Sequence, residues 1–247
     1  MTSGSDRVLL VHGIAQDRTM WIDQRRELGD LRTIAHEIRG HGSAPLGVAE
    51  GTLAQLGRDL IERLEEVGPS ACVGFSLGGA VALWAASERP DLVERVVAIA
   101  TSSIVGRTAV ADLTRRISTV RAQGAEAVRD MLTRDTAAQL PAGFADFDRV
   151  VAERLRAVSD PRGYLNGLRA VRSMGDGSLH RRLARVRSPV LVVAAELDDV
   201  CPRRAAEILL DGLPHARLEE IAGAHHLVSY TDGAAVTGVI RRGLEAR

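Results

Sequence analysis

Short apolar runs alternate with helix-like stretches near both ends of the chain, and this alternation constrains the fold more than any other feature. Runs of this length and composition are typical of strands buried on both faces. The expected strands cover residues 8–11, 31–38, 71–73, 93–100, 189–195 and 216–221, and the expected helices cover 21–28, 52–67, 77–87, 202–210 and 234–244. The alternation predicts right-handed βαβ units and a doubly wound, mostly parallel sheet with helices on both faces.

The middle of the chain breaks this alternation. Residues 102–187 are rich in Ala, Arg, Leu and Val, which favours helices, with breaks at residues 141–143 and 160–161. We therefore expect an α/β core made of residues 1–101 and 188–247. Residues 102–187 are expected to form a helical cap that is inserted between these parts and lies over the sheet.

The overall composition narrows the class of protein. Lys and Arg number 32 and so do Asp and Glu, so the basic excess that is usual in nucleic-acid-binding proteins is absent. No apolar run approaches the roughly 18 residues needed to span a bilayer, and residues 1–6 lack the basic and apolar regions of a signal peptide. The two cysteines, Cys72 and Cys201, make no disulfide framework, and no Cys/His cluster has metal-ligand spacing. We expect a cytoplasmic monomer or homodimer that binds neither nucleic acid nor membrane and uses no metal or cofactor.

A glycine-rich turn between an expected strand and an expected buried helix carries the sharpest local signal. Residues 74–79 read Gly-Phe-Ser-Leu-Gly-Gly and match the Gly-x-Ser-x-Gly pattern of a nucleophile elbow. Such a turn projects the Ser76 hydroxyl above the sheet, and the glycines let strand and helix backbones approach without Cβ clashes. The pattern alone also fits an ordinary turn with a passive serine, so the assignment depends on a base and an acid elsewhere.

A nucleophilic serine needs a general base and an acid that orients the base, in the chain order Ser, Asp/Glu, His. An acidic segment follows the expected strand 189–195, at the carboxyl end where open parallel sheets place their sites. Within it, Asp198 is the preferred acid, and Asp199 and Glu196 are the alternatives.

Two adjacent histidines, His225 and His226, follow the last expected strand. Either can reach Ser76 from that loop, and the residues alone favour His225. The backbone amides of Leu77, at the start of a helix, and Ile14, in the loop after the first strand, are the candidate oxyanion donors.

Taken together, these segments resemble the α/β-hydrolase superfamily. The resemblance rests on His12-Gly13 followed by Trp21, on residues 37–43 as D-x-R-G-x-G-x-S with Glu for Asp, on the elbow at 74–79, on residues 195–202 as G-x-x-D-x-x-x-P with Ala for Gly, and on residues 223–226 as G-x-G-H with His225 for the second Gly. The resemblance implies an α/β-hydrolase fold with a helical cap inserted after the sixth strand of the fold. It makes His226 the base and Asp198 the acid.

The resemblance implies a serine hydrolase that cleaves a small-molecule carboxylic ester or lactone through an acyl-enzyme. Residues 160–170 look like the end of the cap in small bacterial esterases and 3-oxoadipate enol-lactonases. The same fold also serves carbon–carbon bond hydrolases, lyases and perhydrolases, and a ligand receptor that retains the triad is a non-enzymatic alternative.

The cap is the only indication of the substrate. Residues 107–187 contain 16 Arg against 9 acids, a net charge of +7. A basic lid over the pocket could favour an anionic ester or lactone. A solvated helix surface with ion pairs is the alternative, and the charge pattern favours it. The candidate substrate-binding residues are Trp21, Phe75, Phe144, Phe147 and Tyr164. The cap aromatics among them could instead form the cap's own small core.

Overall fold

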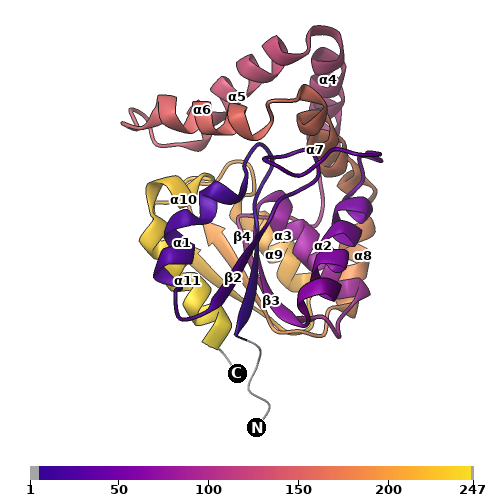
Figure 1. Ribbon diagram of the computed structural model, residues 1–247, viewed down its shortest axis with the longest axis vertical. Coiled ribbons are helices and arrows are strands. Elements are labelled where there is room, and N and C mark those ends of the chain that lie inside the picture. The colour runs from indigo at the N-terminus through magenta and orange to yellow at the C-terminus, as the bar shows by residue number, and fades with distance from the viewer. Residues whose placement is uncertain (1–5, 246–247) are drawn as a thin grey trace.

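The centre of the computed structural model, which describes residues 6–245, is a six-stranded sheet in which every pairing is parallel (Figure 1). The strand order is β2-β1-β3-β4-β5-β6. The strands are β1 (Arg7–Val11), β2 (Arg32–His36), β3 (Ser70–Phe75), β4 (Val93–Ile99), β5 (Val190–Ala195) and β6 (Ala216–Ile221). The expected parallel α/β sheet is confirmed. The expectation about a signal peptide falls almost wholly on residues 1–5, which lie outside the described residues.

Successive side chains of each strand point to opposite faces of the sheet, and each face builds its own hydrophobic cluster. The layer with α1 (Ile22–Glu27) and α11 (Gly233–Glu245) lies on one face, and the layer with α2 (Leu53–Val67), α3 (Leu77–Glu88) and α9 (Arg203–Gly212) lies on the other. Leu10, Val73 and Leu191 contribute to the first cluster. Leu9 and Cys72 contribute to the second. Both faces are therefore covered, as the continuous apolar strands predict.

Local sequence features explain the burial of α3 and the start of α2. Residues 77–87 of α3 are all buried, because this helix lies between the sheet and α2. Thr52 caps the amino end of α2 by accepting a hydrogen bond from the amide of Gln55 (3.1 Å). The burial of α3 matches the expected buried helix, and α2 lies within the expected helix of residues 52–67.

A group of helices lies above the carboxyl ends of the strands and forms the cap (Figure 1). It consists of α4 (Arg107–Gln123), α5 (Ala125–Gln139), α6 (Phe147–Ala157) and α7 (Pro161–Ser173). The cap follows β4, the fourth strand of the described chain. The expectation placed the cap after the sixth strand, counted by the strands of the full α/β-hydrolase fold. The expected breaks at 141–143 and 160–161 separate α5 from α6 and α6 from α7.

The final part of the expected cap packs as part of the core. After η2 (Met174–Asp176), the short helices α8 (Ser178–Arg182) and η3 (Leu183–Arg185) contact α3. Three side chains of this segment are buried in the hydrophobic cluster on the face of the sheet that α3 covers. These are Leu179, Leu183 and Val186. The segment that lies over the strand ends is thus shorter than residues 102–187.

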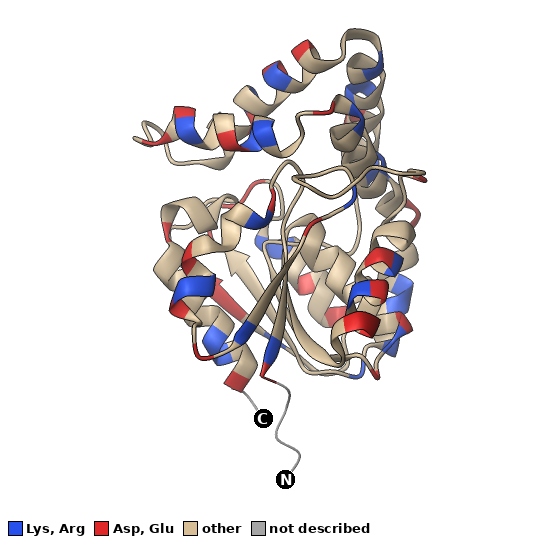
Figure 2. Cartoon of the chain, in the orientation of Figure 1, with Lys and Arg blue, Asp and Glu red and all other residues tan. Residues whose placement is uncertain are grey.

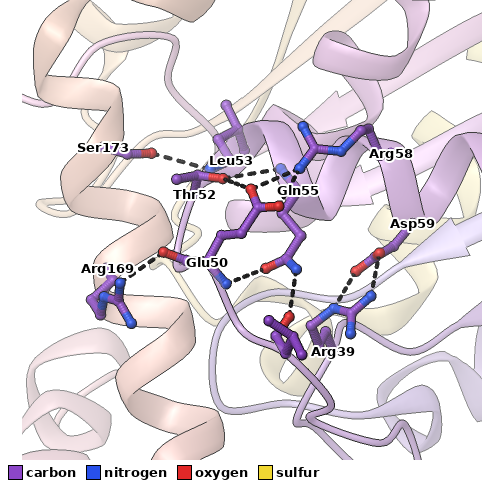
Figure 3. Close-up of polar contacts among 10 residues, drawn as sticks. Arg39, Glu50, Thr52, Leu53, Gln55, Arg58, Asp59, Arg169 and Ser173 are labelled. Atoms are coloured by element: carbon purple, nitrogen blue, oxygen red, sulfur yellow. Dashed lines mark hydrogen bonds and ion pairs between the residues drawn. The ribbon is translucent and has the colours of Figure 1, made fainter.

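The cap is joined to the core through α7, as Figure 3 shows. The Arg169 guanidinium donates to the carbonyl oxygen of Glu50 (2.7 Å), and the amide of Leu53 donates to the Ser173 hydroxyl (3.1 Å). The Glu50 carboxylate also pairs with Arg58 (2.7 Å). These bonds fix α7 against the start of α2.

Arginines and acids are interleaved on the surfaces of the cap helices (Figure 2). On α6, for example, Arg149 pairs with Asp146 (2.8 Å) and Glu153 (3.0 Å) while its side chain stays about half exposed. Most of the cap's basic excess therefore faces solvent. Between residues 6 and 245, the structure contains no helix with the length and apolar character needed to cross a membrane.

Candidate active site

Ser76 occupies the turn between β3 and α3 with a backbone conformation that few non-glycine residues adopt. Its φ is 51° and its ψ is −119°. The Ser76 amide donates to the carbonyl of Ile99 (2.9 Å), and its carbonyl accepts from the Thr101 hydroxyl (2.6 Å). Bonds to Ile99 at the end of β4 and to Thr101 in the segment after it hold this strained turn, and the serine remains half-buried where its neighbours are buried.

The glycines of the elbow are required by backbone contacts. A Cβ on Gly74 would lie 2.3 Å from the carbonyl oxygen of Gly78, and a Cβ on Gly78 would lie 2.2 Å from the carbonyl oxygen of Val11. The first turn of α3 thus rests directly on the end of β1. This packing brings the amide of Leu77 next to the loop that follows β1.

Ser76, His226 and Asp198 form one hydrogen-bonded chain across three loops. His226 Nε2 lies 3.2 Å from Ser76 Oγ, and His226 Nδ1 lies 2.7 Å from Asp198 Oδ2. Because an ionised carboxylate only accepts hydrogen bonds, Nδ1 carries the proton and Nε2 is left to accept from the serine hydroxyl. Asp198 and His226 are both buried, so water competes little for their contact.

The loop after β5 fixes the carboxylate of Asp198. Its second oxygen, Oδ1, accepts from the amides of Val200 (2.8 Å) and Cys201 (2.9 Å). Asp199, the alternative acid, is exposed. The geometry therefore places Asp198, and not Asp199, behind the histidine ring.

Glu196, the other alternative acid, connects the acid loop to the histidine loop. Its carboxylate accepts from the amide of Gly223 (2.7 Å), and the amide of Leu197 donates to the carbonyl of Ala224 (2.8 Å). These two bonds set the position of His226. His225, which the residues alone favoured, is half-buried and makes no hydrogen bond to another described residue.

The two expected oxyanion donors lie on adjacent backbone segments. Leu77 is the first residue of α3, so no carbonyl within the helix can accept from its amide. In the loop after β1, the Gln16 side chain accepts from the amide of Gly13 (3.0 Å). Within residues 6–245, the Ile14 amide has no hydrogen-bond acceptor, which leaves it available to a ligand. Sequence reasoning missed Gln16, because nothing in its neighbourhood indicates that its side chain turns back onto the loop.

His12 holds this loop in place and was not expected to do so. Its Nε2 accepts from the amide of Ile38 (2.9 Å), and its Nδ1 donates to the carbonyl of Gly13 (2.7 Å). Burial, reinforced by the nearby His41, keeps the pKa of His12 well below its ordinary value, so the ring is neutral. A neutral imidazole with one donor and one acceptor satisfies both bonds.

The five aromatic residues that were expected to bind substrate differ in burial and in the groups they pack against. The Phe75 ring packs against the His226 ring with centroids 5.2 Å apart. Phe144 and Phe147 are half-buried and pack against the hydrophobic cluster that contains Phe75. Trp21 and Tyr164 are buried, with exposed fractions of 0% and 2%. Trp21 packs in the same cluster as Phe75, and Tyr164 packs among cap residues and Ala15 of the loop after β1. Their assignment as substrate-binding residues stays a prediction.

Within residues 6–245, one group of three side chains could hold a metal ion. It consists of Asp198, Cys201 and His226. Their ligand atoms lie within 4.8 Å of one another. Burial raises the pKa of the Cys201 thiol, which disfavours the thiolate that a metal would bind. Since the other two side chains bond to each other, the arrangement suits proton transfer better than metal binding.

Comparisons with known proteins agree with this architecture. The model of the alpha/beta hydrolase family matches residues 8–239. A putative carbamate hydrolase, RutD, of Klebsiella pneumoniae is 27% identical over 98% of this chain and 92% of its own length, and 3-oxoadipate enol-lactonase 2 of Acinetobacter baylyi is 26% identical over 90% and 83%. The crystal structure of a hydrolase from Pseudomonas aeruginosa PA01 has 28% identity, a TM-score of 0.84 and coverage of 99% of this chain and 92% of the other. The chain belongs to the alpha/beta hydrolase family.

Proposed function

We propose that this protein is a serine hydrolase that cleaves a carboxylic ester or lactone of a small molecule through an acyl-enzyme on Ser76. One observation carries the proposal. The Ser76 hydroxyl, the His226 ring and the Asp198 carboxylate form a continuous chain with separations of 3.2 and 2.7 Å. Such a chain is the arrangement that general-base activation of a hydroxyl requires.

In the acylation step, Ser76 Oγ attacks the acyl carbon while His226 Nε2 accepts the hydroxyl proton. Asp198 stabilises the imidazolium that forms and keeps the ring oriented. The amides of Leu77 and Ile14 donate to the oxyanion of the tetrahedral intermediate. As the intermediate collapses, the bond from the acyl carbon to the leaving oxygen breaks, and His226 returns its proton to that oxygen.

Deacylation repeats the same steps with water. His226 removes a proton from water as the water oxygen attacks the acyl carbon of the Ser76 ester. The bond between the acyl carbon and Oγ then breaks, the proton passes back to Oγ, and the free acid leaves. The serine is restored and the overall reaction consumes one water.

Carbamate hydrolysis is the second candidate. It is favoured by the similarity to proteins named putative carbamate hydrolases. A carbamate, like an ester or lactone, has a carbonyl carbon bonded to a heteroatom leaving group, so the same residues serve both reactions. A comparison of p-nitrophenyl acetate with a p-nitrophenyl carbamate of similar size separates the two.

Turnover of p-nitrophenyl acetate by the wild-type chain and by Ser76→Ala tests the proposal. Ser102→Ala is the matched control, because Ser102 lies in the loop after the neighbouring strand β4 and its hydroxyl donates to the carbonyl of Ile104. We expect hydrolysis by the wild type and the control, and a loss of roughly 10³-fold or more in Ser76→Ala. Equal activity in all three variants contradicts the proposal. A single slow turnover with ligand-dependent stabilisation indicates a receptor instead.

A further inference from the structure

The arginines of the cap are not equivalent. Among all the arginines that the structure describes, Arg154 alone is buried, with an exposed fraction of 3%. It lies on α6, the helix whose Arg149 side chain stays half exposed among surface ion pairs. The basic excess of the cap therefore includes one cation that is withdrawn from water.

Arg154 has no counter-ion in residues 6–245. Its Nη1 donates to the hydroxyl of Thr136 (2.8 Å) and to Oε1 of Gln139 (3.1 Å), which are both neutral groups. Its Nε is buried without a hydrogen-bond partner. A buried charge that lacks an opposite charge is strongly unfavourable unless a ligand or another group compensates it.

The charged and titratable groups near Arg154 compensate its charge only in part, because the effect of burial outweighs the favourable charge of the nearby Asp135. Asp135 is already bound by two bonds to Arg116 (2.6 and 2.9 Å). Burial raises the pKa of Tyr164 and of Tyr230 to about 12, so both phenols are neutral at neutral pH. Burial also lowers the pKa of Arg154 itself, which reflects the cost of keeping its charge out of water.

The environment of Arg154 connects it to the candidate active site. Gln139, which accepts from Arg154, also accepts through its carbonyl a hydrogen bond from the amide of Leu227 (3.2 Å), the residue after His226. Val150, one turn before Arg154 on α6, is buried in the cluster that contains Leu227 and Phe75. Gln139 thus links the Arg154 guanidinium to the loop that carries His226.

We propose that Arg154 binds a carboxylate of the substrate, so that the enzyme prefers esters or lactones that bear a free carboxylate. The planar guanidinium presents several donors that match the two oxygens of a carboxylate, and its Nε has no protein acceptor. The substrate anion would supply the counter-charge that the chain lacks. This inference rests on the proposed hydrolase function and names its substrate class.

Two p-nitrophenyl esters with the same acyl chain, one anionic and one neutral, test the proposal. Mono-p-nitrophenyl succinate carries a free carboxylate, and its methyl ester has the same acyl chain without the charge. We expect the wild type to prefer the anionic ester by about tenfold or more in kcat/KM. In Arg154→Gln, this preference should fall by about tenfold or more, mainly through KM, as expected for the loss of a charge-assisted contact. Arg149→Gln, on the same helix, should keep the wild-type preference.

The outcome that overturns the proposal is a preference ratio that is the same in wild type and Arg154→Gln, even if both rates fall, because a purely structural arginine affects both esters alike. A wild type without any preference also overturns it. If Arg154→Gln does not fold, Arg154→Lys carries the test. Lysine keeps the positive charge but lacks the planar guanidinium, so its preference for the anionic ester should fall between those of the wild type and a neutral variant. An unchanged preference counts against the proposal.

A binding measurement separates this inference from the proposed function. Succinate should raise the melting temperature of Ser76→Ala, which cannot form an acyl-enzyme, and should have a smaller effect on Ser76→Ala/Arg154→Gln. This result supports the anion site even if no ester is hydrolysed. Equal shifts in the two variants, or no shift in either, contradict the anion site even if esters are hydrolysed.

Discussion

The core and the cap of this protein are built on different principles. In the core, apolar strands fix the loops at one edge of the sheet, and backbone contacts at Gly74 and Gly78 leave almost no freedom in the position of Ser76. In the cap, helices α4 to α7 share a small apolar cluster and carry arginines and acids on their surfaces. The core is therefore specified by close packing, and the cap by patterning and surface charge.

This difference separates chemistry from selectivity. The residues proposed to react, Ser76, Asp198 and His226, all come from loops of the core. The residue proposed to select substrate, Arg154, comes from the cap and is the one place where the cap contains a buried charge. Substitutions in the two regions should accordingly have effects of different kinds and sizes.

The largest expected effect is on catalysis by the core. His226→Gln removes the proposed base, so kcat/KM for p-nitrophenyl acetate should fall by roughly 10³-fold or more. His225→Gln changes the adjacent residue, which is half-buried and outside the hydrogen-bonded chain, and its activity should stay within about threefold of the wild type. If the two variants lose activity equally, His226 is not the base.

A pair of glycine substitutions compares packing in the two regions. Gly78→Ala forces a Cβ to within 2.2 Å of the carbonyl oxygen of Val11, and we expect a loss of roughly 3 kcal/mol or more in the free energy of unfolding. Gly106→Ala, just before α4, meets no atom within 4 Å. Its effect should stay within about 0.5 kcal/mol. Urea denaturation of both variants measures the difference, and a stable Gly78→Ala would show that the elbow packs more loosely than described.

Buried histidines of the core should make stability depend on pH. Burial lowers the pKa of His41 to about 4, whereas the unfolded chain titrates near pH 6.5. Below pH 6.5 the unfolded state binds more protons, so stability falls with falling pH until the folded pKa is reached. We expect a loss of about 2 kcal/mol from this residue between pH 6.5 and pH 5. Urea titrations at both pH values should show a smaller loss in His41→Gln, and an equal loss would exclude His41 as a cause.

The smallest expected effect concerns the ion pairs of the cap surface. Arg149→Gln removes half-exposed pairs, so the free energy of unfolding should change by less than about 0.5 kcal/mol. In the core, Arg39 binds Asp59 through two bonds of 2.6 and 2.9 Å (Figure 3), with side chains 25% and 15% exposed. Arg39→Gln should cost about 1 kcal/mol. A larger loss for Arg149→Gln in the same denaturation series would reverse the comparison.

The sequence specified the core much more closely than the cap. Buried strands have continuous apolar residues, and the elbow has glycines that backbone contacts require, so both could be predicted from local patterns. His226 could not be distinguished from His225 by residue type, because the choice depends on Glu196 holding the loop from another strand. Arg154 resembles 15 other arginines of residues 107–187 in the sequence. Only tertiary packing, which buries this side chain and leaves the others near solvent, sets it apart.

Covalent labelling with a fluorophosphonate tests the central claim most directly. An activated serine attacks the phosphorus and releases fluoride, and peptide mass spectrometry then locates the adduct. The proposed mechanism predicts one adduct per chain on Ser76, and a strong reduction of labelling in His226→Gln. An unlabelled protein, or an adduct on another serine with Ser76 unmodified, would contradict the account.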